Sequence, residues 1–180
     1  MIYWYVLTVH KREAKAVEML TANGFEAYMP MHTFTVAYHG RKLLKQRPLI
    51  PGIIFVRVDE DNDQLAALQA LKQTGEGQLL RYSTHPNRDG THTKLRVRDE
   101  EMREFRAVAD HTEQNLMYFR PDEVNLQKGE RVRIIGGVFD GCTGTLTKVK
   151  GARSRRLVVK LESFVAIAAA EIEPDYIQKL

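Results

Sequence analysis

The sequence contains a long stretch whose side chains are suited to electrostatic binding. Residues 27–58 hold no Asp or Glu, but they include Arg41, Lys42, Lys45, Arg47 and Arg57, with His32 and His39 beside them. Cations without neighbouring acids attract polyanions, most often nucleic acid, and phosphate contacts make such binding salt-sensitive. Two interpretations of 41–47 stay open: a nucleic-acid contact or an ordinary solvated face.

A second group of cations follows the N-terminal apolar run. Lys11, Arg12 and Lys15 are expected on an exposed helical turn, where they could join the first group in contacting DNA. Phosphate contacts position a protein on DNA but carry little sequence information. His10, His32 and His39 are candidates for reading the edges of single-stranded bases, with a solvated surface histidine as the alternative for each.

Spacings typical of catalysis or metal binding are missing from the sequence. The six histidines show no metal-ligand spacing, and no Gly-rich phosphate loop follows an expected strand. The single cysteine, Cys142, excludes an intrachain disulfide and a zinc site built from cysteines. Ser154 and Ser163 have no base beside them in the sequence. We therefore predict a protein with no catalytic residue, metal or cofactor.

Length and composition indicate a globular protein of the cytoplasm. The 180 residues are 43% hydrophobic and 28% charged, which is typical of a folded chain with a real core. The chain has 27 Lys and Arg against 23 Asp and Glu. This mild excess of positive charge is weaker evidence for nucleic-acid binding than the clustering of the cations in acid-free stretches. The apolar N-terminal run is too short to span a bilayer, so no membrane association is expected.

The elements that must position these cations alternate between strand and helix over the first 110 residues. β-branched and aromatic runs favour strands, and apolar residues at helical spacing favour helices. Strands are expected at 2–9, 25–31, 52–58 and 79–82, helices at 11–23, 63–74 and 99–110, a basic loop between 31 and 48, and a polar loop at 83–93. This order predicts an α+β domain with an antiparallel sheet backed by helices.

The segment Pro48–Val56 is too apolar for an exposed loop, and we expect a buried strand entered through the Pro51-Gly52 turn. Alternation along a strand places Trp4 and Tyr5 on opposite faces, so one of them could be exposed. For Trp4, Tyr5 and Phe55, the core and a partner-binding surface both remain open interpretations.

The last third of the chain has a different character. Residues 111–127 have weak periodicity and are expected to be a linker. From residue 128 onward, short β-rich runs separated by glycines predict a small all-β barrel over 128–180.

Two sets of residues resemble a known family. Trp4-Tyr5-Val6-Leu7, together with Pro48–Val56, resembles the N-terminal (NGN) domain of the NusG/RfaH family of transcription elongation factors. The KOW motif of that family is matched by Lys128–Ile134, Gly137–Gly141 and Gly144–Leu146. The resemblance covers nearly the whole chain and implies an NGN domain at 1–110, a linker at 111–127 and an SH3-like KOW barrel at 128–180.

The resemblance implies a transcription elongation and antitermination factor, and not an enzyme. Such a protein binds the clamp helices of the RNA polymerase β′ subunit, bridges the cleft toward β, and contacts the non-template DNA strand. The matching polymerase-binding positions are Trp4, Tyr5, Tyr28, Ile50, Pro51, Gly52, Ile53 and Phe55. The expected nucleic-acid contacts are Lys11, Arg12, Lys15, Arg41, Lys42, Lys45 and Arg47. The KOW residues are Gly129, Val132, Ile134, Gly137, Phe139, Gly141 and Gly144.

Three features resemble the specialised RfaH-like and UpxY-like branch, which is associated with surface and capsular polysaccharide operons. They are Lys11-Arg12, Gly40-Arg41-Lys42 and Leu80-Arg81-Tyr82. The family's barrel recruits a small-subunit ribosomal protein or the termination factor Rho, and the strand expected to face that partner begins at Phe164. An alternative from another class is a ribosome- or RNA-associated binding module in which the KOW barrel is primary.

Overall fold

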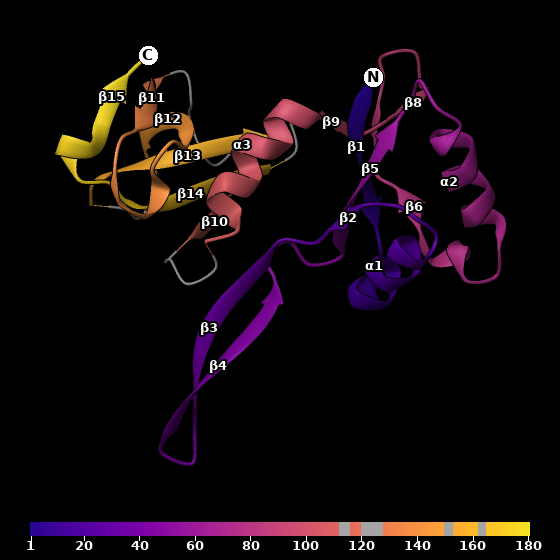
Figure 1. Cartoon of the computed structure of the whole chain (residues 1–180), viewed down its shortest axis with the longest axis horizontal. Helices are drawn as coiled ribbons and strands as arrows, with labels where there is room; N and C mark the ends of the chain where they lie inside the picture. The colour runs from indigo at the N-terminus through magenta and orange to yellow at the C-terminus, as the bar shows by residue number, and fades with distance from the viewer. Residues whose placement is uncertain (112–115, 120–127, 150–152, 162–164) are drawn as a thin grey trace. The chain divides into compact units, whose positions relative to one another are not determined.

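The computed structural model describes residues 1–111, 116–119, 128–149, 153–161 and 165–180 (Figure 1). The chain divides into two compact units. Unit 1 comprises Met1–Pro30 and Pro48–Asp99, and unit 2 comprises Met31–Arg47 and Glu100–Leu180. This division by contacts groups residues 31–47 and 100–110 with the C-terminal part, whereas the sequence motifs group them with the N-terminal part.

Unit 1 is built on an antiparallel sheet in the order β2-β5-β1-β6, with β9 also paired to β1. Its strands are β1 (Ile2–Thr8), β2 (Ala27–Tyr28), β5 (Ile53–Asp59), β6 (Arg81–Tyr82) and β9 (Arg96–Arg98). β1 and β5 pair over their whole length, from Ile2 opposite Asp59 to Thr8 opposite Ile53. Because both strands are rich in β-branched and aromatic residues, they form the buried centre of this sheet.

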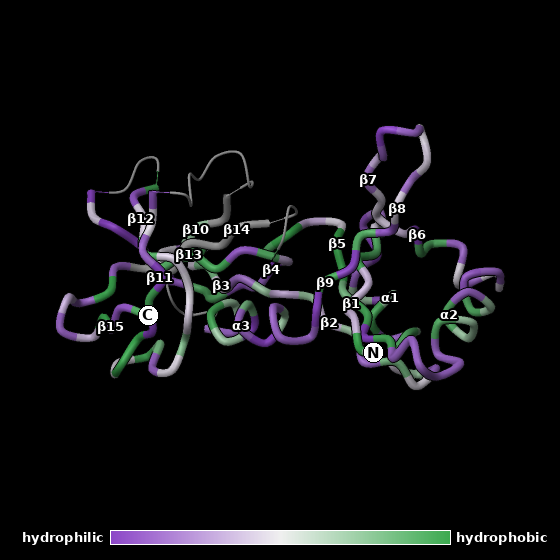
Figure 2. Tube along the Cα trace, turned by 90° about the horizontal axis from the view of Figure 1, so that it is seen from above, coloured by the Kyte–Doolittle hydropathy of each residue, from purple (hydrophilic) through white to green (hydrophobic). Residues whose placement is uncertain are grey.

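Helices cover one face of this sheet. α1 (Glu13–Ala22) and α2 (Gln64–Gln73) send Ala16, Leu20 and Leu68 into a core that also contains Leu7 and Ile54. The apolar character of β5 is visible along the chain trace (Figure 2). α1 ends before Gly24, and α2 is followed by the short 3-10 helix η1 (Gly77–Leu79). Both helices, β1 and β5 agree with the elements expected from periodicity, whereas the strands expected at 25–31 and 79–82 are shorter, at Ala27–Tyr28 and Arg81–Tyr82.

Two segments expected as loops form β-hairpins instead. The basic stretch folds into β3 (Met31–Tyr38) and β4 (Arg41–Pro48), because alternating β-branched and aromatic residues lead into a two-residue turn. The polar stretch folds into β7 (Thr84–Pro86) and β8 (His92–Lys94). There Asn87 donates to the Thr91 hydroxyl at 2.7 Å and closes the hairpin. Both expectations of a loop were therefore wrong.

Unit 2 contains nearly all of α3 (Asp99–Ala109) and an antiparallel sheet in the order β10-β14-β13-β12-β11-β15. Its strands are β10 (Met117–Phe119), β11 (Glu130–Ile134), β12 (Thr143–Lys148), β13 (Arg155–Leu161), β14 (Val165–Glu171) and β15 (Ile177–Lys179). Short 3-10 helices lie at Gly137–Phe139 and Pro174–Tyr176. Glu104 of α3 holds the sheet by accepting hydrogen bonds from Arg131 at 2.8 Å and Thr143 at 2.7 Å.

The expected fold class is confirmed: the chain is α+β, with an antiparallel sheet backed by helices and a small all-β region at its C-terminal end. Within the segment expected as a linker, Met117–Phe119 forms a strand paired with β14, while residues 112–115 and 120–127 lie outside the described part. Phe164 also lies outside it. Among the described residues, no helix has the length and apolar character needed to cross a membrane.

Candidate functional site

Three aromatic side chains form a row on one face of the unit 1 sheet. Trp4 lies on β1, Phe55 on β5 and Tyr28 on β2, and Tyr28 pairs directly with Phe55. The ring centres of Trp4 and Tyr28 are 6.4 Å apart, and those of Tyr28 and Phe55 are 6.2 Å apart. Edge-to-face and tilted contacts at such distances stabilise aromatic clusters. We call these three residues the aromatic row.

Most of the aromatic row is buried. Trp4 is 2% exposed and Phe55 0% exposed, whereas Tyr28 is half-buried. The Trp4 indole Nε1 donates to Asp99 Oδ1 at 2.9 Å, and Arg57 Nε lies 3.3 Å from the same oxygen. Trp4 and Tyr5 lie on opposite faces, as alternation predicts. The expectation that one of them could be exposed is wrong, because Trp4 is 2% and Tyr5 4% exposed.

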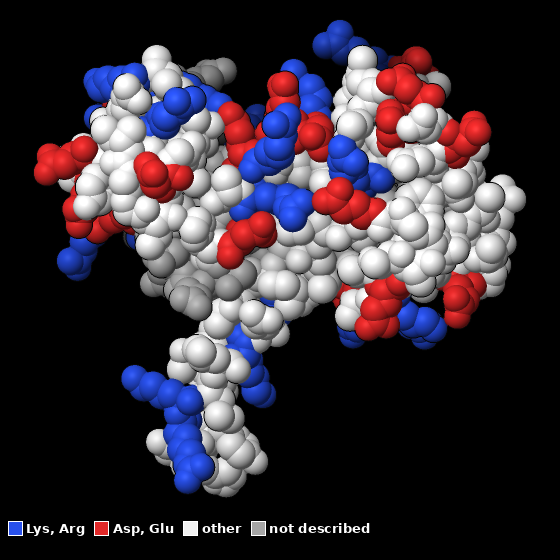
Figure 3. Space-filling view, in the orientation of Figure 1, with Lys and Arg blue, Asp and Glu red and all other residues white. Residues whose placement is uncertain are grey.

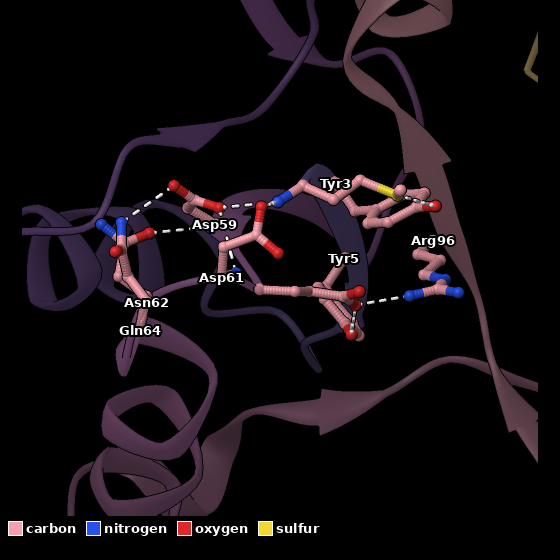
Figure 4. Close-up of polar contacts among 9 residues, drawn as sticks. Tyr3, Tyr5, Asp59, Asp61, Asn62, Gln64 and Arg96 are labelled. Carbon is pink, nitrogen blue, oxygen red and sulfur yellow. Dashed lines mark hydrogen bonds and ion pairs between the residues drawn. The ribbon is translucent and has the colours of Figure 1, made fainter.

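Tyr5 belongs to a polar cluster on the other face of the sheet (Figure 4). Its hydroxyl donates to Glu60 Oε1, and Arg96 also donates to that carboxylate oxygen. Arg96 lies over the Tyr3 ring at 4.0 Å. Burial, and then the hydrogen bond to Glu60, raises the pKa of Tyr5 to about 12. This cluster holds Tyr5 as a structural residue of the core.

The free energy of unfolding is expected to fall at alkaline pH, where the Tyr5 hydroxyl loses its proton. The pKa of Tyr5 rises from 10.0 to about 12 on folding, so between these values the folded protein binds more protons than the unfolded chain. The free energy of unfolding then falls as pH rises through this window. In urea titrations, the stability gap between wild type and Tyr5→Phe should be largest below pH 10 and shrink towards pH 12. A gap that is independent of pH would contradict this assignment.

The aromatic row continues into a tight turn before β5. Ile53 N donates to Ile50 O at 3.3 Å, with Pro51 and Gly52 between them and a φ of 78° at Gly52. Proline followed by a residue with positive φ is the pattern of a type II turn, which favours glycine at the second position. Gly52 N also donates to Glu13 Oε1 at 2.7 Å, which ties the turn to α1.

The turn offers apolar surface to solvent. Ile50 is buried at 5% exposure, but Pro51 is exposed, and Gly52 and Ile53 are half-buried. Ile53 lies on the same face as the aromatic row, because two-residue steps along β5 lead from it to Phe55. Of the eight expected contact positions, four are accessible: Tyr28, Pro51, Gly52 and Ile53.

Arg12, one of the cations after β1, borders a pocket of about 560 Å³ in unit 1. Its lining includes His10, Arg12 and Arg81, with Thr8, Gln78 and Leu79. Arg81 reaches this place because β6 pairs with β1, with Thr8 opposite Arg81. Among the described residues that line it, none is acidic, so the pocket suits an anionic group such as phosphate. Sequence reasoning identified Arg12 and His10 but not Gln78 or Arg81 as partners in one site.

Lys11 and Lys15 are exposed beside Arg12, and Lys11 has a φ of 54°. A positive φ is uncommon for a residue with a Cβ atom, and it marks the sharp change from β1 into α1. All three cations are exposed where β1 leads into α1, as expected, but Lys11 and Arg12 precede the helix and only Lys15 lies on it.

The hairpin β3–β4 carries the other expected nucleic-acid contacts. Arg41, Lys42, Lys45 and Arg47 are all exposed, and the visible face of the hairpin shows lysine and arginine side chains among uncharged residues, with no acid (Figure 3). Arg47 lies over the Phe34 ring, 5.0 Å from its centre. The hairpin is thus a cationic ribbon with aromatic side chains.

The residues that resemble the KOW motif lie in the all-β region of unit 2. Val132, Ile134 and Phe139 are buried in its core. Gly144 lies where an added Cβ would come within 2.8 Å of the Leu157 side chain, so close strand packing requires glycine there. Of the remaining positions, Gly129 lies before β11, Gly137 begins the 3-10 helix Gly137–Phe139, and Gly141 follows that helix before β12.

A pocket of about 200 Å³ opens beside that loop. Its lining includes the apolar side chains of Val138 and Tyr176 and the acidic side chains of Glu171 and Glu173. Within the described residues, no group of His, Cys, Asp or Glu is arranged to hold a metal ion.

Comparisons with known proteins found one matching family model and one similar relative. Residues 2–106, more than half of the chain, match the family model described as transcription termination factor nusG. The chain is also 22% identical over 189 aligned positions to the transcription termination/antitermination protein NusG of Borreliella burgdorferi, and the alignment covers 98% of each protein.

Proposed function

Because the chain belongs to the NusG family of transcription termination/antitermination factors, whose members bind RNA polymerase, we propose that it binds the clamp helices of the polymerase β′ subunit. From there it bridges toward β and restrains opening of the cleft. Such a bridge favours the elongating state over paused states through its differential affinity for the two. Pausing and termination are then suppressed without any chemistry performed by the protein.

The contact surface in this proposal is the exposed end of the aromatic row. Tyr28, Pro51 and Ile53 are accessible apolar groups, and the type II turn holds them in place. Trp4, Tyr5, Ile50 and Phe55 act from below as a rigid support, because they are buried. The observation that carries the proposal is this row of apolar side chains ending in an ordered, accessible turn.

We place the polymerase-binding part at 1–110 and the KOW part at 128–180. DNA contact in this proposal comes from two cationic surfaces: Lys11, Arg12 and Lys15 in unit 1, and Arg41, Lys45 and Arg47 of the hairpin in unit 2. The non-template strand is the ligand, since it is single-stranded within the transcription bubble. The pocket beside Arg12 and Arg81 supports this role for unit 1.

The specialised branch is part of the same proposal. Arg81, from the Leu80-Arg81-Tyr82 segment, lines one pocket with Arg12, from the Lys11-Arg12 pair. Two of the three branch features thus form one cationic surface, which supports an operon-specific role at surface or capsular polysaccharide genes. The KOW region recruits a small-subunit ribosomal protein or Rho, and the apolar pocket beside Val138 and Tyr176 supports protein binding there.

Affinity capture from lysate with the full chain tests the proposal. Core polymerase subunits should be recovered, and an excess of an isolated clamp-helix fragment should displace them. In transcription by the purified polymerase, adding the chain should increase the fraction of full-length transcript. Recovery of ribosomal RNA without polymerase would instead support the alternative of a ribosome-associated KOW module.

A further inference from the structure

The turn of the β3–β4 hairpin determines which residues share a face. β3 ends at Tyr38 and β4 begins at Arg41, so the loop has two residues, His39 and Gly40, with φ values of 48° and 75°. Two positive φ values in a two-residue loop are the mark of a type I′ turn, which pairs the flanking residues directly. Tyr38 therefore lies opposite Arg41. Each step back along β3 then matches one step forward along β4, so that Thr33 lies opposite Gln46.

Side-chain contacts agree with this register. Gln46 Nε2 donates to Thr33 Oγ1 at 3.3 Å, as expected for residues directly opposite each other. The His32 and Phe34 rings are stacked with centres 6.3 Å apart, as neighbours two positions apart on one strand should be. Arg47 lies over Phe34, its diagonal neighbour across the strands.

The register separates the hairpin into two unlike faces. Opposed residues point to the same side of an antiparallel pair, so one face carries three of the four cations together with the aromatic rings. We call this the stacking face; its members are His32, Phe34, Val36, Tyr38, Arg41, Leu43, Lys45 and Arg47. The opposite face holds Thr33, Thr35, Ala37, Lys42, Leu44 and Gln46. Lys42 is therefore the one cation of the hairpin on the opposite face.

Exposure on the stacking face increases toward the tip. Tyr38 is 61% exposed, and its ring is held edge-on by His39 with centres 4.3 Å apart. Phe34 and Val36 are half-buried nearer the base. An exposed, oriented ring opposite an arginine is the arrangement that binds an unpaired base, since the base stacks on the ring while the cation meets the phosphate.

Resting on the proposed function, we propose that the stacking face binds the displaced single strand of the transcription bubble by base stacking on Tyr38, and not by charge alone. Arg41, Lys45 and Arg47 contact the phosphates on the same side. Bases within a duplex are already stacked and paired, so they cannot use Tyr38 in this way. Lys42, on the other face, does not contribute.

Fluorescence anisotropy with the full-length chain tests this assignment. The probe is a fluorescein-labelled, mixed-sequence DNA single strand of about 12 nucleotides, within the usual range of binding-site sizes. Tyr38→Ala should weaken binding about tenfold with an unchanged salt dependence, because stacking involves no counterion release. Tyr38→Phe keeps the ring and should bind as wild type does.

The two lysines provide a matched pair. Lys45→Ala should reduce the slope of log affinity against log salt by about 0.7, the value for one phosphate contact on a single strand. Lys42→Ala removes the same charge from the opposite face and should change neither affinity nor slope. The same probe annealed to its complement should bind more weakly, and Tyr38→Ala should not affect that binding.

Three results would overturn the inference: wild-type binding by Tyr38→Ala, equal effects of Lys42→Ala and Lys45→Ala, or tighter binding of the duplex. All variants lie at exposed positions, so their unfolding curves should match the wild type. Capture of core polymerase by the same variants separates the two proposals. If they capture polymerase normally but one of these three results is obtained, only the stacking inference fails.

Discussion

Replacing Ile53 by aspartate is expected to weaken binding to core RNA polymerase by about thirtyfold or more while the protein stays folded. Ile53 is half-buried at the accessible end of the aromatic row. A partner that covers this position would therefore also remove the substituted aspartate from water. A buried carboxylate without a partner is costly at an interface. Binding to immobilised polymerase, measured by surface plasmon resonance, gives the affinity directly.

The controls separate lost contact from lost fold. Ile53→Leu keeps the apolar area and should bind like the wild type. Leu65→Asp makes the same change at a half-buried leucine of α2, which packs on the helix-covered face of the sheet. It should lower stability but leave polymerase affinity within about twofold. Normal binding by Ile53→Asp would show that the turn is not the contact surface.

Ile50 is unsuitable for this test, although the family pattern assigns it the same role. Its side chain is 5% exposed, so an aspartate there would destabilise the fold. A double change at Ile50 and Ile53 would therefore confuse unfolding with lost contact.

Replacing Phe55 by alanine should lower the free energy of unfolding by about 3–5 kcal/mol, the range for a fully buried aromatic ring. Phe55 is 0% exposed at the centre of the sheet, and its ring contacts Tyr28. Urea unfolding followed by circular dichroism measures the change. The transition midpoint should fall markedly, because the loss is a large fraction of the stability of an ordinary domain.

Tyr38→Ala is the comparison for this prediction, because it removes an exposed aromatic ring and should change stability by no more than about 0.5 kcal/mol. If Phe55→Ala were as stable as the wild type yet failed to bind polymerase, Phe55 would be a contact residue and the burial argument would be wrong. Measuring both the stability and the polymerase binding of Phe55→Ala thus decides whether Phe55 supports the fold or contacts the polymerase.

The secondary structure of the central elements could be predicted because local residue patterns dominate there. The stripe of Leu65, Leu68 and Leu71 defines α2, and the β-branched runs define β1 and β5. The hairpin β3–β4 was missed because its many cations resemble a solvated loop, and its strand pairing depends on a two-residue turn. β9 was missed because three residues carry too little periodicity to identify a strand.

The candidate site was less predictable than the fold. Residue types alone could not show that Trp4 and Phe55 are buried while Ile53 remains accessible, because all three are apolar residues of strands or turns. Nor could they place Arg81 beside Arg12, since about seventy positions separate them and only the pairing of β6 with β1 brings them together.

By itself, the amino-acid sequence determined the α+β class, the family motifs and the acid-free basic stretch, because these depend on composition, spacing and local periodicity. The tertiary structure alone decided which apolar side chains are covered and which cations share a pocket or a hairpin face. Burial and strand register arise from contacts between residues far apart in the chain, and no local pattern contains them.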